Sequence, residues 1–82
     1  MGQFDQYINH SDPIISKAGS DLDVATTDLK AGSLTKAEYD EICGDILDES
    51  MLASLIKDMV RLQEIYDAFK ELTNIVSTIN SL

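Results

Sequence analysis

The pattern of apolar residues is strongest in residues 50–82, where it predicts one long helix. From Leu52 onward, apolar positions recur at alternating spacings of three and four, the heptad rhythm of a helix that packs along its length. We expect this first apolar face to pack against the rest of the chain. Its residues are Leu52, Leu55, Met59, Leu62, Tyr66, Phe69 and Val76, with Thr73 filling one slot.

A second apolar face begins halfway along the same helix and follows the same rhythm. Its upstream positions, Arg61 and Asp58, are polar. The rest of the chain offers only two short helices to cover this one, which would leave much of the second face exposed to solvent. We therefore expect this face to contact another chain, either a second copy or a larger helical protein. If it were buried within the chain instead, it would give no support for assembly. The face consists of Ile65, Ala68, Leu72, Ile75, Ile79 and Leu82.

Two shorter helices are predicted upstream, and residues 12–49 together form an acidic helical hairpin. Asp12, followed by a proline, is a helix start, because Asp caps free N–H groups and Pro suits the first helical position. Gly32 is placed to end this helix in a left-handed conformation. Thr35 with Glu38 forms a capping box that starts the next helix. The apolar residues of this hairpin expected in the core are Ile15, Ala18, Leu22, Ala25, Leu29, Tyr39, Ile42, Cys43, Ile46 and Leu47.

The whole of residues 1–82 is predicted to form one all-α domain with coiled-coil-like packing. Residues 1–11 are a lead-in, whose apolar side chains either dock on the core as a flap or serve as a recognition motif. We expect residues 48–50 to bend the chain, with Asp48 or Ser50 as the cap of the long helix. The apolar side chains of the lead-in are Phe4, Tyr7 and Ile8.

Charge is distributed unevenly along the chain, whose formal net charge is −9. Most of the acids lie before residue 50, whereas the last third is nearly neutral. Nucleic-acid backbones and anionic membrane surfaces both require Lys and Arg, so we expect neither as a direct partner. On the long helix, Arg61 is expected to pair with Asp58 and Glu64. No run of apolar residues is long enough to span a membrane, and the N-terminus lacks a signal-peptide pattern.

The joint between the two shorter helices is the one segment with a family resemblance. It resembles the SHOCT type of short helical hairpin, a leucine before a glycine turn followed by Leu-Thr, an acidic-aromatic pair and a hydrophobic helix. The resemblance covers residues 28–47 and implies a hairpin used for association, with no catalytic residues. The chain departs from that type because a long helix follows the hairpin. The segment reads Asp28-Leu29-Lys30-Ala31-Gly32-Ser33-Leu34-Thr35-Lys36-Ala37-Glu38-Tyr39 and continues to Ile46-Leu47.

An acidic stripe lies along the second helix of the hairpin and consists of Glu38, Glu41, Asp45 and Asp48. These residues are spaced by three or four positions, so their carboxylates share one helix face about 15 Å long. The stripe is either a solvated face or a functional one, which would be a mimic of DNA phosphates or a docking strip for a basic partner. As a metal site it is poor, because a helical di-metal centre needs histidines at set spacings and His10 is the only histidine.

No arrangement of residues indicates an enzyme or a cofactor. Cys43 lies beside apolar residues, which favours a buried small hydrophobe over a nucleophile. We therefore predict a non-enzymatic structural or assembly subunit, cytoplasmic or part of a virion, since its size, acidity and packing-rich helix are similar in style to small phage virion and assembly proteins. The alternative is an acidic inhibitor that occupies the basic groove of a nucleic-acid-binding protein. Salt distinguishes them, because ionic binding weakens with salt and apolar packing persists.

Overall fold

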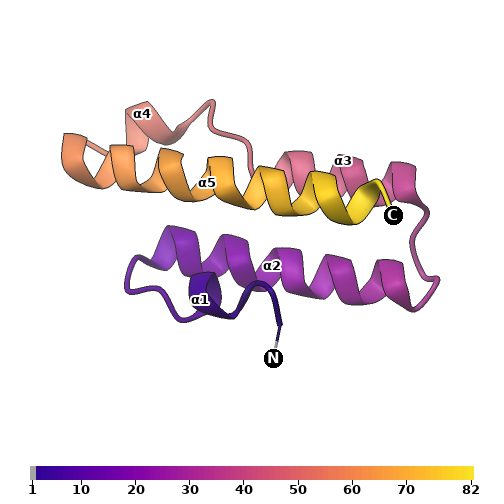
Figure 1. The fold of residues 1–82 in the computed structure, drawn as a ribbon. Helices are drawn as coiled ribbons and strands as arrows, with labels where there is room; N and C mark the ends of the chain where they lie inside the picture. The colour runs from indigo at the N-terminus through magenta and orange to yellow at the C-terminus, as the bar shows by residue number, and fades with distance from the viewer. Residues whose placement is uncertain (1) are drawn as a thin grey trace.

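The computed structural model describes residues 2–82, and these residues form helices and connecting loops without a β-strand. The all-α prediction is therefore confirmed for this part of the chain. Figure 1 shows the order of the elements. They are α1 (Asp5–Ile8), α2 (Pro13–Lys30), α3 (Lys36–Ile46), α4 (Leu52–Leu55) and α5 (Met59–Asn80).

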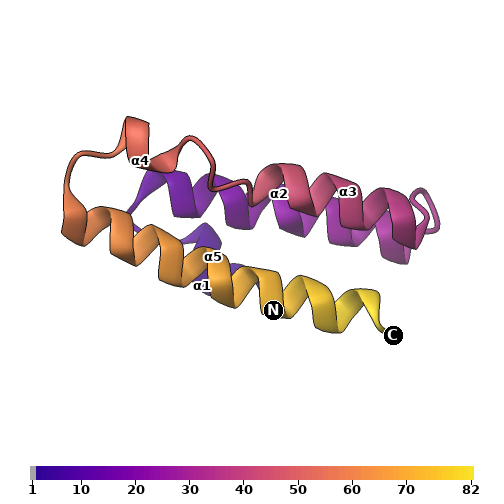
Figure 2. The same cartoon turned by 90° about the horizontal axis from the view of Figure 1, so that it is seen from above.

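The three longer helices pack together as an up-down-up arrangement. Helices α2 and α3 run in opposite directions as a hairpin, and α5 returns along both of them (Figures 1 and 2). The prediction of a hairpin against a C-terminal helix is confirmed.

Capping hydrogen bonds are formed at the helix starts that the sequence predicted for the hairpin. A side-chain oxygen of Asp12 accepts the N–H of Ile14 at 2.9 Å and starts α2. At the start of α3, Thr35 Oγ1 accepts the Glu38 N–H, and Glu38 Oε1 accepts the Thr35 N–H. Between the two helices Gly32 has φ +83°, the left-handed conformation that glycine adopts without a steric penalty.

The lead-in forms a short helix that docks on the core. This is the first of its two predicted roles, a flap rather than a recognition motif. Phe4 and Tyr7 are buried, and the Tyr7 hydroxyl donates a hydrogen bond of 2.7 Å to Glu71 of α5. Close approach of α1 to α2 depends on Gly19. A Cβ at this position would lie 2.8 Å from the Cβ of Tyr7.

One continuous apolar stripe of α5 forms the centre of the core, and it differs from both faces predicted from the sequence. The stripe takes every seventh residue from each predicted face, so the spacings along it again alternate between three and four. The neighbouring positions, such as Tyr66 and Ile75, lie half-buried at its edges. The buried residues of the stripe are Leu62, Ile65, Phe69, Leu72, Val76 and Ile79.

The prediction of one long helix from residue 50 is wrong, because residues 56–58 are not helical. Asp58 caps α5 by accepting the N–H groups of Val60 and Arg61, so the helix starts at Met59. The expected bend at residues 48–50 is present, where a side-chain oxygen of Asp48 accepts the N–H of Ser50. This residue does not cap a long helix, however, since only the single turn of α4 follows.

The segment between α3 and α5 fills space that α3 is too short to cover. Helix α3 has 11 residues and α5 has 22, so at 1.5 Å per residue they are about 16 Å and 33 Å long. Figure 1 shows α4 beside the start of α5, at the end that α3 does not reach. Leu52 and Ile56 are buried there, whereas Leu55 and Met59, which were expected in the core, are exposed.

Two helical glycines have opposite surroundings and give a paired stability test. A Cβ at Gly44 would meet nothing within 4 Å, so Gly44→Ala is expected to stabilise the fold by about 0.5–1 kcal/mol. Gly19→Ala is expected to destabilise it by about 1–3 kcal/mol, because α1 must move. Urea unfolding of both variants measures the difference. Equal effects would contradict the packing of α1 against α2.

Candidate protein-binding surface

The second predicted face of the C-terminal helix is mostly internal core. Ile65 and Leu72 are fully buried, Ala68 and Ile79 nearly so, and Ile75 is half-buried. The four buried residues, Ile65, Ala68, Leu72 and Ile79, therefore belong to the internal core and are not available to another chain, whereas contact through Ile75 stays a prediction. Helices α2 and α3 both lie against α5, and the buried stripe of α5 combines residues from both predicted faces. Of the predicted interface, Leu82 is exposed, near the end of the chain.

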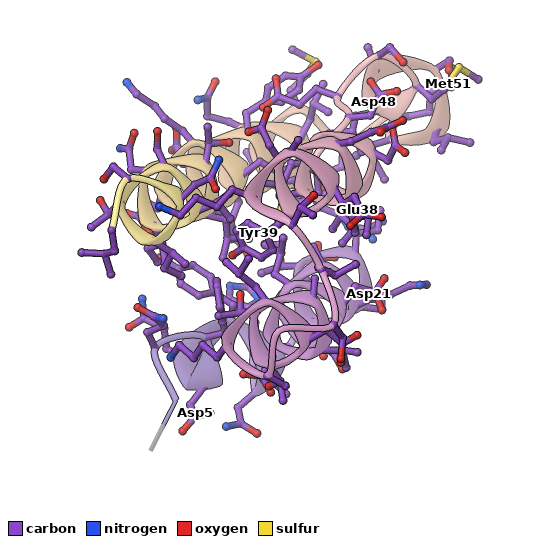
Figure 3. All side chains as sticks on the ribbon, turned by 90° about the vertical axis from the view of Figure 1, so that its right-hand side faces the viewer. Asp5, Asp21, Glu38, Tyr39, Asp48 and Met51 are labelled. Carbon is purple, nitrogen blue, oxygen red and sulfur yellow. The ribbon has the colours of Figure 1, made fainter. Side chains whose placement is uncertain are left out.

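The acidic stripe lies on the exposed side of α3 and the loop after it. Two of its members have local structural roles. Hydrogen bonds from the N–H groups of Thr35 and Ser50 lower the pKa values of Glu38 and Asp48, respectively. The other two members, Glu41 and Asp45, form no ion pair with any of residues 2–82. In Figure 3, Glu38 points outward on the same side of the molecule as Asp21 of α2.

The potential nucleophile Cys43 belongs to the packed interior. Its side chain is buried, and burial raises the pKa of the thiol. Nearby, Tyr39 points into the space between α2, α3 and α5 (Figure 3), and its hydroxyl lies 2.7 Å from that of Thr26. Burial raises the pKa of Tyr39 to about 12. A protonated thiol beside a protonated phenol is suited to packing and not to nucleophilic attack.

The surface that the sequence interpretation missed lies around α4 and the first turn of α5. Four large apolar side chains, which we call the Met51–Val60 patch, are exposed there. Met51, Leu55, Met59 and Val60 are 63%, 67%, 73% and 79% exposed, respectively. In Figure 3, Met51 points outward at the edge of the molecule. The signal that could have revealed this patch was Asp58, which is a preferred residue type for starting a helix.

The first turn of α5 is tied to the start of α2 by an ion pair that the sequence analysis also missed. Arg61 was expected to pair along its own helix, but its guanidinium instead donates to both oxygens of Asp12, at 2.7 and 3.2 Å. The Asp12 side chain is only 7% exposed, and the Arg61 hydrogen bonds hold its pKa below the usual value. His10 adds a further contact, because its Nε2 lies 3.3 Å from Glu64 Oε1. The helix that carries Met59 and Val60 is thereby fixed in place.

Metal-binding clusters and membrane-spanning helices were also sought among residues 2–82. This part of the chain contains no group of three or more His, Cys, Asp or Glu side chains that could hold a metal ion. None of its helices is long and apolar enough to cross a membrane.

Comparison with known proteins adds no family to this description. No family model, no curated protein and no solved structure matches the chain. The resemblance of residues 28–47 to a SHOCT hairpin stays a prediction.

Replacing Arg61 with Met tests the link between α2 and α5. The variant leaves the Asp12 carboxylate without its cationic partner, and we expect a lower unfolding free energy than that of the wild type at neutral pH. Because the folded-state pKa of Asp12 is lowered from 3.8, the pair stabilises the protein above that value and loses its effect as the pH falls through the lowered pKa. The variant and the wild type should therefore converge in acid.

Lys70→Met is the matched control, because Lys70 is exposed and forms no ion pair with residues 2–82. It should change stability by less than about 0.5 kcal/mol. Urea unfolding followed by circular dichroism at several pH values measures both variants. A loss in Arg61→Met that stays constant down to strongly acidic pH would contradict the role of Asp12.

Proposed function

We propose that this protein is a non-enzymatic assembly or binding subunit that holds a protein partner on the Met51–Val60 patch. The observation that supports the proposal is the exposure of four large apolar side chains within ten residues of sequence. Elsewhere in residues 2–82, the large apolar side chains exposed to this degree are the isolated Val24 and Leu82. Exposed apolar residues that gather at one place on a small protein typically mark an interaction surface.

The energetics of the patch favour association. Burying a large apolar side chain contributes roughly 1.5–3 kcal/mol relative to leaving it exposed. Methionine is also common at binding surfaces, because its unbranched and polarisable side chain adapts to different partners. Two of the four patch residues, Met51 and Met59, are methionines. A rigid helix start with flexible side chains on it loses little conformational freedom when a partner binds.

The proposal also includes a biological setting for such a subunit. Small size, high acidity and a packing-rich C-terminal helix are similar in style to small phage virion and morphogenesis proteins. The SHOCT-like joint at residues 28–47 also implies association. We therefore propose assembly of a protein complex, such as a phage head or tail, as the setting.

A second candidate function is an acidic inhibitor of a nucleic-acid-binding protein. Glu41 and Asp45 favour it, because they are exposed and form no ion pair with residues 2–82. The net charge of −9 also favours an acidic inhibitor. This candidate is weaker, since the other two acids of the stripe have local structural roles: Glu38 accepts the N–H of Thr35 in the capping box, and Asp48 accepts the N–H of Ser50.

Capture experiments on the native source with matched variants test the proposed function. The double variant Leu55→Ser with Met59→Ser removes apolar area from the patch, and it should lose the partner while circular dichroism shows an unchanged helix content. The control, Val24→Ser with Leu82→Ser, removes exposed apolar area elsewhere and should retain the partner. Binding through the patch should also persist at high salt.

The acidic inhibitor predicts a different set of results. Glu41→Gln with Asp45→Asn should then abolish capture, and binding by the wild type should weaken steeply as salt is raised. Retention of the partner by the Leu55→Ser and Met59→Ser variant would contradict the patch as the binding surface.

A further inference from the structure

A hollow beside the patch combines apolar surface with negative charge. It is a shallow, widely open depression on the exposed side of the first turns of α5, and all of its lining residues belong to that helix. Met59 and Val60 supply its apolar wall, while Glu64 and Asp67 supply carboxylates. Such a combination suits a long side chain that has an aliphatic stem and a cationic end, as Lys and Arg have. The hollow is lined by Met59, Val60, Gln63, Glu64 and Asp67.

The negative charge continues from this hollow along α5. A second hollow of about 340 Å³ shares Glu64 and Asp67 and adds Glu71, between α1 and α5. Asp67 accepts a hydrogen bond from the neutral amide of Gln63, and Glu71 accepts one from the Tyr7 hydroxyl. Neither carboxylate forms an ion pair with residues 2–82. Asp67 and Glu71 therefore have negative charge available for a partner, while Glu64 Oε1 lies 3.3 Å from His10 Nε2.

The charge around the patch opposes a second copy of this chain as its occupant. Residues 48–67 contain five acids against two bases, Lys57 and Arg61, and Arg61 is already bound to Asp12. Two copies would each bring a net charge of −9 to the contact. Like charges placed across an interface oppose association, whereas a basic partner is attracted to it.

The backbone conformation that the partner needs also follows from the fold. Residues 2–82 contain no strand, so they offer no sheet edge to which an extended peptide could add. A peptide that is buried against this surface must then satisfy its own backbone N–H and C=O groups, and a helix does so. An apolar helix face against the patch, flanked by cations, is the corresponding arrangement.

We propose that the segment that occupies the Met51–Val60 patch is a basic amphipathic helix of a partner protein. This inference depends on the proposed function, and it specifies the chemistry of the partner. The apolar face of the helix packs on Leu55 and Met59. Its Lys or Arg side chains lie along Met59 and Val60 and place their cationic ends at Glu64, Asp67 and Glu71.

Synthetic peptides of Leu and Lys provide the test, each of about 18 residues, or five turns of helix. The first peptide has the amphipathic order, the second has the same composition in scrambled order, and the third has Glu in place of Lys. Calorimetry measures affinity for the full chain, and methyl NMR spectra locate the contact. We expect the amphipathic basic peptide to bind, to gain helix content and to shift the methyl signals of Leu55, Met59 and Val60.

A matched pair of variants separates local charge from total charge. Glu64→Gln with Asp67→Asn should weaken binding of the basic peptide about three- to thirtyfold, the effect of losing two partly exposed ion pairs. Glu41→Gln with Asp45→Asn removes the same charge from α3 and should leave the affinity within about twofold, because neither residue lines the two hollows and solvent screens exposed charges that make no direct contact.

Several results would overturn the inference. They are the absence of binding, equal binding of the acidic or scrambled peptide, and methyl shifts confined to α3. If the basic peptide fails while Leu55→Ser with Met59→Ser still abolishes capture of the native partner, the helix chemistry is wrong and the proposed function stands. If that double variant retains the native partner, the proposed function itself fails.

Discussion

Burial of the apolar stripe on α5 is the interaction on which the rest of the structure depends. Six large side chains on that stripe are buried, and removing each of them from water contributes roughly 1.5–3 kcal/mol. Helix α3 covers only part of the length of α5. The chain between them must therefore fill the remaining end of the core, and it does so with Leu52 and Ile56.

Filling the core with this connecting segment leaves other apolar side chains of the segment on the surface. A single turn of helix cannot bury every apolar side chain of the connecting segment, so Met51 and Leu55 remain exposed while Leu52 is buried. Asp58 then starts α5 immediately beyond, which leaves Met59 and Val60 in an exposed first turn. The ion pair between Asp12 and Arg61 holds this turn against the start of α2. The patch is thus exposed because of the way the core is completed.

The sequence predicted local structure better than it predicted the pairing of faces. Capping residues such as Thr35 act on their own neighbours, so the start of α3 and the end of α2 were predicted correctly. Two overlapping heptad faces on α5 could not be separated, because the choice between them depends on which helices lie against α5. The pair Asp12–Arg61 spans residues far apart in sequence, and no local rule indicates it. The acidic stripe was predicted to be either a solvated face or a docking surface, and all four of its side chains are exposed.

The central claim is that the chain buries its own heptad stripe and leaves residues 51–60 open. Broadening of methyl NMR signals by a soluble nitroxide measures this directly in the full chain. We predict strong broadening for Leu55, Met59 and Val60, and protection of Ile65, Leu72 and Ile79. The reverse result, with Leu72 and Ile79 broadened and Leu55 and Met59 protected, would contradict the account, since α5 would then present its second face to another chain.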